Sequence, residues 1–177
     1  MFAIDDAMRD VVARATEPAL AAIKLAWWRE RLAELDAGKV PAEPRLQAAA
    51  DELLSRNIAG ASLAGLEEGW AAMLDADPYP EQVVARGVRL FDMASSLLGV
   101  ADPMIETAGR LYALVSIVHR PTVSVELAGH RFPRALRPLT GLTALAARDA
   151  RRRTPEPQGT PGRALALLRH RLTGRIG

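Results

Sequence analysis

LAWWRERL, residues 25–32, sets two adjacent tryptophans directly before a run of charged side chains. In a helix that begins at Pro18, spacings of three and four residues predict one continuous apolar face. That face carries Ala21, Leu25, Trp28, Leu32 and Leu35, and a second stripe beside it carries Leu20, Ile23 and Trp27. Apolar side chains on two sides indicate a central helix that packs between neighbours.

Large aromatic side chains usually serve packing. We therefore expect Trp27 and Trp28 to form the wall of a core or of a shrunken cavity, without contact to a reacting group. Phe91 and Tyr112, which lie in later apolar segments, are the other two candidate wall residues.

Helical periodicity continues through most of the chain. Alanine and leucine are frequent, β-branched runs are short, and proline and glycine fall between the periodic segments. The pattern predicts an all-α, single-domain helical bundle over residues 1–177 with about eight helices. They are predicted at about 2–15, 18–37, 45–57, 62–75, 80–99, 103–119, 134–152 and 161–173. The segment TPEPQGTPG, residues 154–162, is the predicted linker before the C-terminal helix.

The composition narrows the class of protein. The 177 residues include no cysteine, which excludes disulfides, thiolate metal sites and a cysteine nucleophile. No apolar run approaches the roughly 20 residues needed to cross a bilayer, and the N-terminus opens on acids, unlike a signal peptide. Phosphate-binding loops and the G-x-S-x-G motif of serine hydrolases are absent from the sequence. We expect a cytoplasmic protein.

The net charge of +2 hides an asymmetry between the two parts of the chain. Residues 1–130 carry 12 basic and 19 acidic side chains, a net charge of −7, whereas residues 131–177 carry 11 arginines and two acids, a net charge of +9. The basic part either packs on the acidic N-terminal half or meets phosphate, anionic lipid or an acidic protein surface. A peripheral membrane contact through this Arg-rich part is one alternative, while nucleic acid is not expected because no recognition motif accompanies the charge.

Several segments resemble, in order, those of the squalene/phytoene synthase family. EPALAAIKLAWWRERL resembles the family segment E-P-x-L-x-x-I-R-L-x-W-W-R-x-x-L and is the most specific of them. The others are VPAEPRLQAA (40–49), ARGVRLFDMASSLLG (85–99), TAGRLYALVSIVHR (107–120) and GHRFP (129–133). The resemblance covers most of the chain and implies the type I isoprenoid-synthase fold.

Members of that family condense two prenyl diphosphates head to head, with Mg²⁺ held between aspartates on facing helices. The ions neutralise the diphosphate leaving group, so two facing carboxylate clusters are needed. The resemblance therefore directs attention to two stretches of this chain. No other cofactor is implied, and Mg²⁺ is expected only if the chain is catalytic.

The first carboxylate cluster is partly present. Asp6 and Asp10, four residues apart, share a helical face and can hold one ion. In the family register, however, Arg9 and Ala13 stand at aspartate positions of D-D-x-x-D, and only Asp10 matches. Asp5 and Asp6 fall one turn early, where acids complement the positive end of the helix dipole.

The second carboxylate cluster is missing from the sequence. SIVHRPTVSVE, residues 116–126, has Ser116 and Arg120 in place of acceptor groups, and Pro121 ends the predicted helix. Arg120 repels Mg²⁺ because its guanidinium keeps its charge. The three histidines, His119, His130 and His170, lack metal-ligand spacing. No metal ligand is assigned beyond the weak pair Asp6 and Asp10.

Three functions remain open at this point. The first is a non-catalytic squalene/phytoene synthase-like protein with a binding or assembly-factor role, resembling the respiratory complex I assembly factor of the same family. The second is a diverged prenyltransferase of isoprenoid biosynthesis that uses Asp6 and Asp10 for Mg²⁺ and Arg9, Arg120 and Arg131 for diphosphate. The third is a protein that binds a prenyl lipid or quinone between its helices. The missing second carboxylate cluster favours the first of these functions. A protein or a prenyl lipid is the expected partner.

Overall fold

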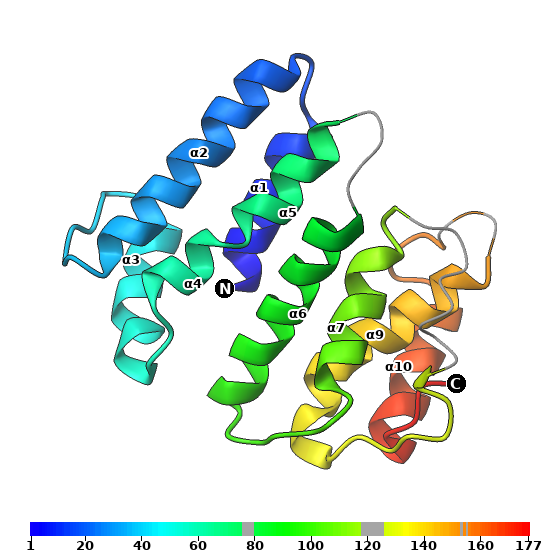
Figure 1. Ribbon diagram of the computed structural model, residues 1–177. Helices are drawn as coiled ribbons and strands as arrows, with labels where there is room; N and C mark the ends of the chain where they lie inside the picture. Colours follow the sequence, from blue (N-terminus) through cyan, green and yellow to red (C-terminus); the bar gives the residue numbers. More distant parts are fainter. Residues whose placement is uncertain (76–79, 118–125, 153, 155) are drawn as a thin grey trace. The chain divides into compact units, whose positions relative to one another are not determined.

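The computed structural model describes residues 1–75, 80–117, 126–152, 154 and 156–177 of the chain (Figure 1). The chain divides into two compact units, Met1–Arg86 and Gly87–Gly177. Within the described residues, every regular element is helical, and Arg131 and Arg175 form an isolated antiparallel bridge. The predicted all-α class is confirmed, whereas the assignment to a single domain stays a prediction.

The first unit is built from short and medium helices. Proline occupies the first helical position of several of them, where its missing N–H costs no hydrogen bond. The elements are α1 (Phe2–Ala13), α2 (Pro18–Leu35), α3 (Pro44–Glu52), η1 (Leu54–Arg56), α4 (Gly60–Ala64), α5 (Glu67–Ala71), η2 (Ala72–Leu74) and the start of α6 (Pro80–Leu97).

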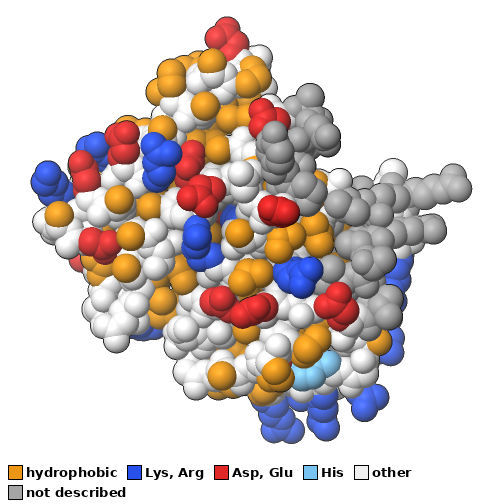
Figure 2. Space-filling model, in the orientation of Figure 1, with side chains coloured by type: hydrophobic (Ala, Val, Ile, Leu, Met, Phe, Trp, Pro, Cys, Tyr) orange, Lys and Arg blue, Asp and Glu red, His pale blue; other side chains and the backbone are white. Residues whose placement is uncertain are grey.

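Helix α2 is buried along one of its two apolar stripes. The first stripe lies in the core as predicted, with Ala21, Leu25, Trp28, Leu32 and Leu35 all buried. The second stripe is exposed, because Leu20, Ile23 and Trp27 keep 47%, 67% and 42% of their surface accessible. Figure 2 shows hydrophobic side chains gathered over the start of this helix. The prediction that α2 packs between neighbours on both sides is therefore wrong, and Trp27 lies outside the core.

The predicted helix at 62–75 is replaced by the three short elements α4, α5 and η2. Glycines at Gly60, Gly65 and Gly69 lower the helical propensity of this segment. Gly60 lies against the Leu32 carbonyl oxygen of α2, so closely that a side chain there cannot fit. Asp36 fixes the approach, since its two carboxylate oxygens accept the N–H groups of Gly60 and Ala61 at 2.6 and 2.9 Å. The acid that directly follows α2 thus caps the start of α4.

The second unit contains the rest of α6 together with α7 (Ile105–Leu114), η3 (Arg134–Leu136), α9 (Arg137–Ala150) and α10 (Pro161–Thr173). Helices α6 and α7 cross at two glycines. A Cβ on Gly109 would lie 2.5 Å from the Gly87 carbonyl oxygen, so only glycine permits this approach. The predicted helix at 103–119 is shorter than expected and ends at Leu114, while positions 118 and 119 lie outside the described residues.

The C-terminal helix is tied back to the rest of its unit. Gly174 turns the chain after α10 with φ of +74°, and its carbonyl accepts the N–H of Phe132 at 2.9 Å. The buried Arg137 donates from Nη1 to the carbonyl oxygens of Arg171 and Leu172 at 2.8 and 3.0 Å. A cation at this negative helix end stabilises the last turn of α10.

Candidate functional site

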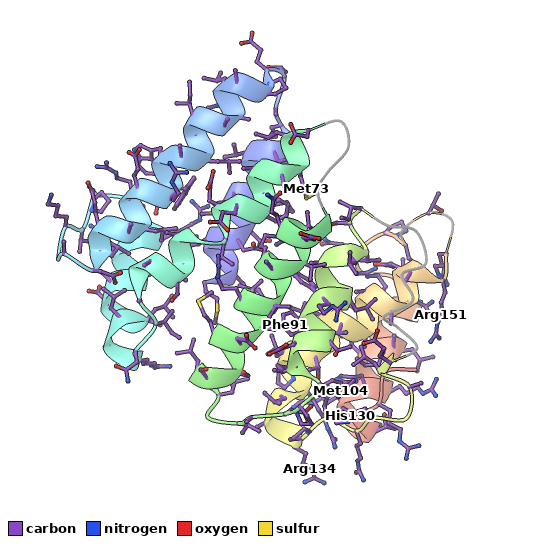
Figure 3. All side chains as sticks on the ribbon, in the orientation of Figure 1. Met73, Phe91, Met104, His130, Arg134 and Arg151 are labelled. Carbon is purple, nitrogen blue, oxygen red and sulfur yellow. The ribbon has the colours of Figure 1, made fainter. Side chains whose placement is uncertain are left out.

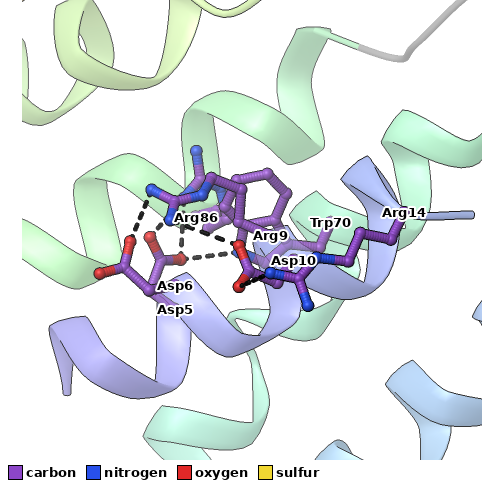
Figure 4. Close-up of polar contacts among 7 residues, drawn as sticks. All are labelled: Asp5, Asp6, Arg9, Asp10, Arg14, Trp70 and Arg86. Atoms are coloured by element: carbon purple, nitrogen blue, oxygen red, sulfur yellow. Dashed lines mark hydrogen bonds and ion pairs between the residues drawn. The ribbon is translucent and has the colours of Figure 1, made fainter. Parts of the chain in front are cut away.

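The candidate magnesium ligands of α1 each lie against an arginine (Figure 4). Arg9 Nη1 is 2.7 Å from Asp6 Oδ1, and Arg9 Nη2 is 3.5 Å from Asp10 Oδ1. Arg14 Nη2 lies 3.4 Å from Asp10 Oδ2. All four side chains are at least 47% exposed. Asp6 and Asp10 therefore do share a face, as the spacing predicts, and that face is exposed, with Arg9 between them.

These residues do not fit a magnesium site. The Arg9 guanidinium bridges the two carboxylates, where a metal ion shared by them would bind, and two cations repel each other there. Across the described part of the chain, no group of three or more His, Cys, Asp or Glu side chains is arranged to hold a metal ion. The pocket beside Asp10, about 250 Å³, is also lined by Arg14 and Lys24.

Asp5 has a different environment from its neighbour Asp6. It is only 2% exposed, and its carboxylate accepts hydrogen bonds from Arg86 Nη1 at 2.8 and 2.9 Å and from Trp70 Nε1 at 2.8 Å (Figure 4). The Arg86 guanidinium lies 4.0 Å from the centre of the Trp70 ring, in a cation–π contact. Asp5 does lie in the first turn of α1, as predicted, and the structure adds direct partners for its carboxylate. Its partners are a buried cation and an indole.

The sequence contains a signal for this buried cluster that motif analysis misses. Asp5 lies beside Ile4 and one turn before Met8, and both of these are buried. Arg86 interrupts the apolar spacing between Val83 and Leu90 in the same way. A charged residue in a buried helical stripe requires a partner of opposite charge.

Glu67 is a second buried acid of the first unit. It is 6% exposed, and Arg29 Nη1 lies 3.5 Å from its Oε2. Burial raises the pKa of Glu67, and the Arg29 charge acts in the opposite direction. Two buried acids of this unit thus have arginine partners: Asp5 pairs with the buried Arg86, and Glu67 pairs with the exposed Arg29.

The aromatic candidates divide by exposure. Trp28 is buried, and its ring meets the more exposed Trp27 ring edge to face, with centroids 5.3 Å apart. In the second unit Phe91 is fully buried, and its ring centroid lies 5.4 Å from that of Tyr112. A role of these residues as walls of a ligand cavity stays a prediction.

The region of the missing second cluster is only partly described. Ser116 donates its hydroxyl hydrogen to the Ala113 carbonyl at 2.6 Å, while Arg120 lies outside the described residues. Arg131 is exposed and pairs through its backbone with Arg175. The Arg137 pKa is lowered by burial and by the charges of Arg131 and Arg134.

Asp102 organises the start of α7. One carboxylate oxygen accepts the Met104 N–H at 2.9 Å, and His130 Nε2 lies 2.9 and 3.1 Å from the two oxygens. Figure 3 shows His130 and Met104 close together at this end of the second unit. The contacts explain His130 as a structural partner of a buried acid.

Arginine side chains line an open pocket beside α10. Its volume is about 590 Å³, and its lining includes Arg148, Arg151, Arg152, Arg169 and Arg175. Arg134 of η3 and Arg151, which directly follows α9, extend away from the ribbon (Figure 3). The predicted basic character of residues 131–177 therefore appears as a real surface of the second unit.

Comparisons of the chain with protein-family models, curated proteins and solved structures found no match. Among the described helices, none is both long enough and apolar enough to span a membrane. The charged groups of the described residues are therefore characterised by their own geometry: an acidic face of α1 neutralised by Arg9, a buried Asp5–Arg86 pair, and an arginine-rich surface beside α10.

Proposed function

We propose that the chain is a squalene/phytoene synthase-like protein that acts by binding, in the manner of an assembly factor, without condensing prenyl diphosphates. The ordered motif segments from EPALAAIKLAWWRERL to GHRFP support the relationship and, with it, an isoprenoid-synthase type I fold. The all-α architecture is compatible with that fold. The ion pairs of the acidic residues on α1 support the loss of prenyl diphosphate condensation.

A single observation carries this proposal: the three acids of α1 already have cationic partners. Asp5 is held by Arg86, and Asp6 and Asp10 are bridged by Arg9. Ionisation of a prenyl diphosphate requires divalent cations on the leaving group, and those cations require free carboxylates. Asp5 instead forms a buried ion pair, and Asp6 and Asp10 form exposed ion pairs.

The direct test is turnover of farnesyl diphosphate and of geranylgeranyl diphosphate by the purified chain, with and without Mg²⁺. We expect no condensation product under either condition. Mg²⁺-dependent turnover that Asp10→Ala abolishes would overturn the proposal and identify a diverged prenyltransferase. An Asp51→Ala variant is the control, because Asp51 is an exposed acid on α3.

Ligand binding without turnover is tested separately. Calorimetry with inorganic diphosphate tests the prenyltransferase alternative, in which Arg9, Arg120 and Arg131 bind diphosphate, and we expect no saturable heat at a defined stoichiometry. Native mass spectrometry of the purified protein examines a bound prenyl lipid or quinone. A stoichiometric lipid adduct would replace the assembly-factor role with that of a lipid-binding protein.

A further inference from the structure

The outward face of α10 carries an exposed apolar stripe. Leu165, Leu168 and Leu172 are 67%, 53% and 69% exposed, and their spacing of three and four residues places them on one side of the helix. The opposite side is fixed, since the buried His170 lies 2.8 Å from Thr140 Oγ1. The leucines therefore face outward on a helix that is already folded and anchored.

Arginines flank this stripe on both sides. At 100° per residue around the helix axis, Arg169 lies next to Leu165 at one edge of the stripe. Arg171 lies next to Leu168 at the other edge. Helix α10, PGRALALLRHRLT, contains no acidic residue. The pocket next to it is lined by further arginines, among them Arg151 and Arg175.

The local acids do not neutralise these arginines. Residues 131–177 contain only Asp149 and Glu156 as acids. Arg163 Nη1 lies 2.7 Å from Asp149, and Arg148 Nε lies 2.6 Å from Glu156. Both acids are thereby engaged by arginines outside the leucine stripe. Arg151, Arg169 and Arg171 have no carboxylate partner within the described ranges of the chain.

From this juxtaposition of exposed leucines and unneutralised arginines we infer that the outward face of α10 docks on a bilayer surface that contains anionic lipids. Leucines enter the boundary between headgroups and acyl chains, while flanking arginines bind lipid phosphates. The inference is independent of the proposed function, because it uses only the charge and exposure of the second unit.

A second exposed apolar stripe, on α2, lacks this charge pattern. Leu20, Ile23 and Trp27 on α2 are accompanied by Glu17, Lys24 and Glu30, so both signs of charge lie near them. Nucleic acid is a poorer match to α10 than a bilayer, because duplex phosphates are bound by cations and leave exposed leucines without a role. The leucines decide between these partners.

Flotation with lipid vesicles tests the inference on the full chain. We expect binding to vesicles of phosphatidylcholine with phosphatidylglycerol, little binding to phosphatidylcholine alone, and weaker binding at high salt. The double change Leu165→Ser and Leu172→Ser should weaken binding about tenfold or more. Arg169→Gln with Arg171→Gln should weaken it by about fivefold for each arginine. All four side chains are exposed, and circular dichroism checks that the fold is retained.

Matched controls come from the first unit. Ile23→Ser removes an equally exposed apolar side chain, and Arg56→Gln removes an exposed arginine of η1. Both controls should bind vesicles like the unchanged chain. No binding, equal binding to neutral and anionic vesicles, or equal losses in the controls would overturn the inference. So would tight binding to duplex DNA that the arginine changes weaken and the leucine changes leave intact.

Discussion

Arg86 Nη1 lies within 2.9 Å of both carboxylate oxygens of Asp5, and the two side chains are 3% and 2% exposed. Each charge has left water, so each depends on the other for its stability in the fold. Trp70 adds a hydrogen bond to the acid and an aromatic face to the cation. The pair therefore links α1, α5 and the start of α6 within the first unit.

Asp5→Asn should destabilise the protein by about 3–5 kcal/mol, because Arg86 is then buried without a counter-charge. Thermal or urea unfolding measures the loss. Asp6→Asn is the matched control. The ion pair of Asp6 with Arg9 is half exposed, so this change should lower the free energy of unfolding by about 1 kcal/mol or less.

A double variant separates the lost charge from a lost shape. Asp5→Leu combined with Arg86→Met removes both charges, and it should recover much of the stability that Asp5→Asn loses. Equal stability of the Asp5→Asn and Asp6→Asn variants would contradict the buried pair.

The adjacent tryptophans should differ in their effect on stability. Trp28→Ala removes a buried ring from the core face of α2 and should cost about 3–5 kcal/mol. Trp27→Ala removes a partly exposed ring whose defined contact is the edge-to-face pair with Trp28, so a loss of about 1 kcal/mol is expected. Urea midpoints of the two variants provide the comparison, and a larger loss for Trp27→Ala would contradict the assigned faces.

The crossing of α6 and α7 should reject a single methyl group. Gly109→Ala places a Cβ against the Gly87 backbone, and overpacking of this kind costs about 1–3 kcal/mol. Arg110→Ala, at the next and exposed position of α7, should change the free energy of unfolding by about 0.5 kcal/mol or less. Differential scanning calorimetry of both variants is the measurement. A more stable Gly109→Ala protein would show that the two backbones do not meet.

His170 should make stability depend on pH. Burial lowers the pKa of its imidazole below the ordinary 6.5; the Arg175 carbonyl acts in the opposite direction, and the Arg137 charge lowers the pKa further. The unfolded chain therefore takes up this proton first as the pH falls. The stabilisation by neutral His170 is complete above about pH 6.5 and declines as the pH falls towards the folded-state pKa, below which it is lost.

Chemical denaturation across this pH range measures the decline. His170→Gln should be less stable at neutral pH and should lose this part of the pH dependence. His130→Gln, which changes the partner of Asp102, should keep it. An NMR titration that places the His170 pKa above 6.5 would reverse the sign of the prediction.

Local spacing predicted much of the secondary structure. Helices α2, α6 and α10 begin at Pro18, Pro80 and Pro161, the residues that the pattern identified as helix starts. The chain turns with positive φ at Gly38 and Gly99, near two of the predicted ends. These features depend on neighbours along the chain, so a single sequence contains the necessary information.

The candidate site was less accessible to the same reasoning. The spacing correctly put Asp6 and Asp10 on one face of α1, but it gave Asp5 no partner. Trp70 and Arg86 lie 65 and 81 positions further along the chain, beyond any local period. Only the packing of α1 against later helices decided which of two adjacent aspartates is buried.

By itself, the sequence determined the helical class and the excess of positive charge after residue 130, since both follow from residue types and their spacing. The tertiary structure decided which side of each amphipathic helix is covered: one stripe of α2 is buried and the other exposed, and the leucines of α10 face outward. The physical reason is that periodicity defines a face, whereas burial depends on whether another helix lies against it.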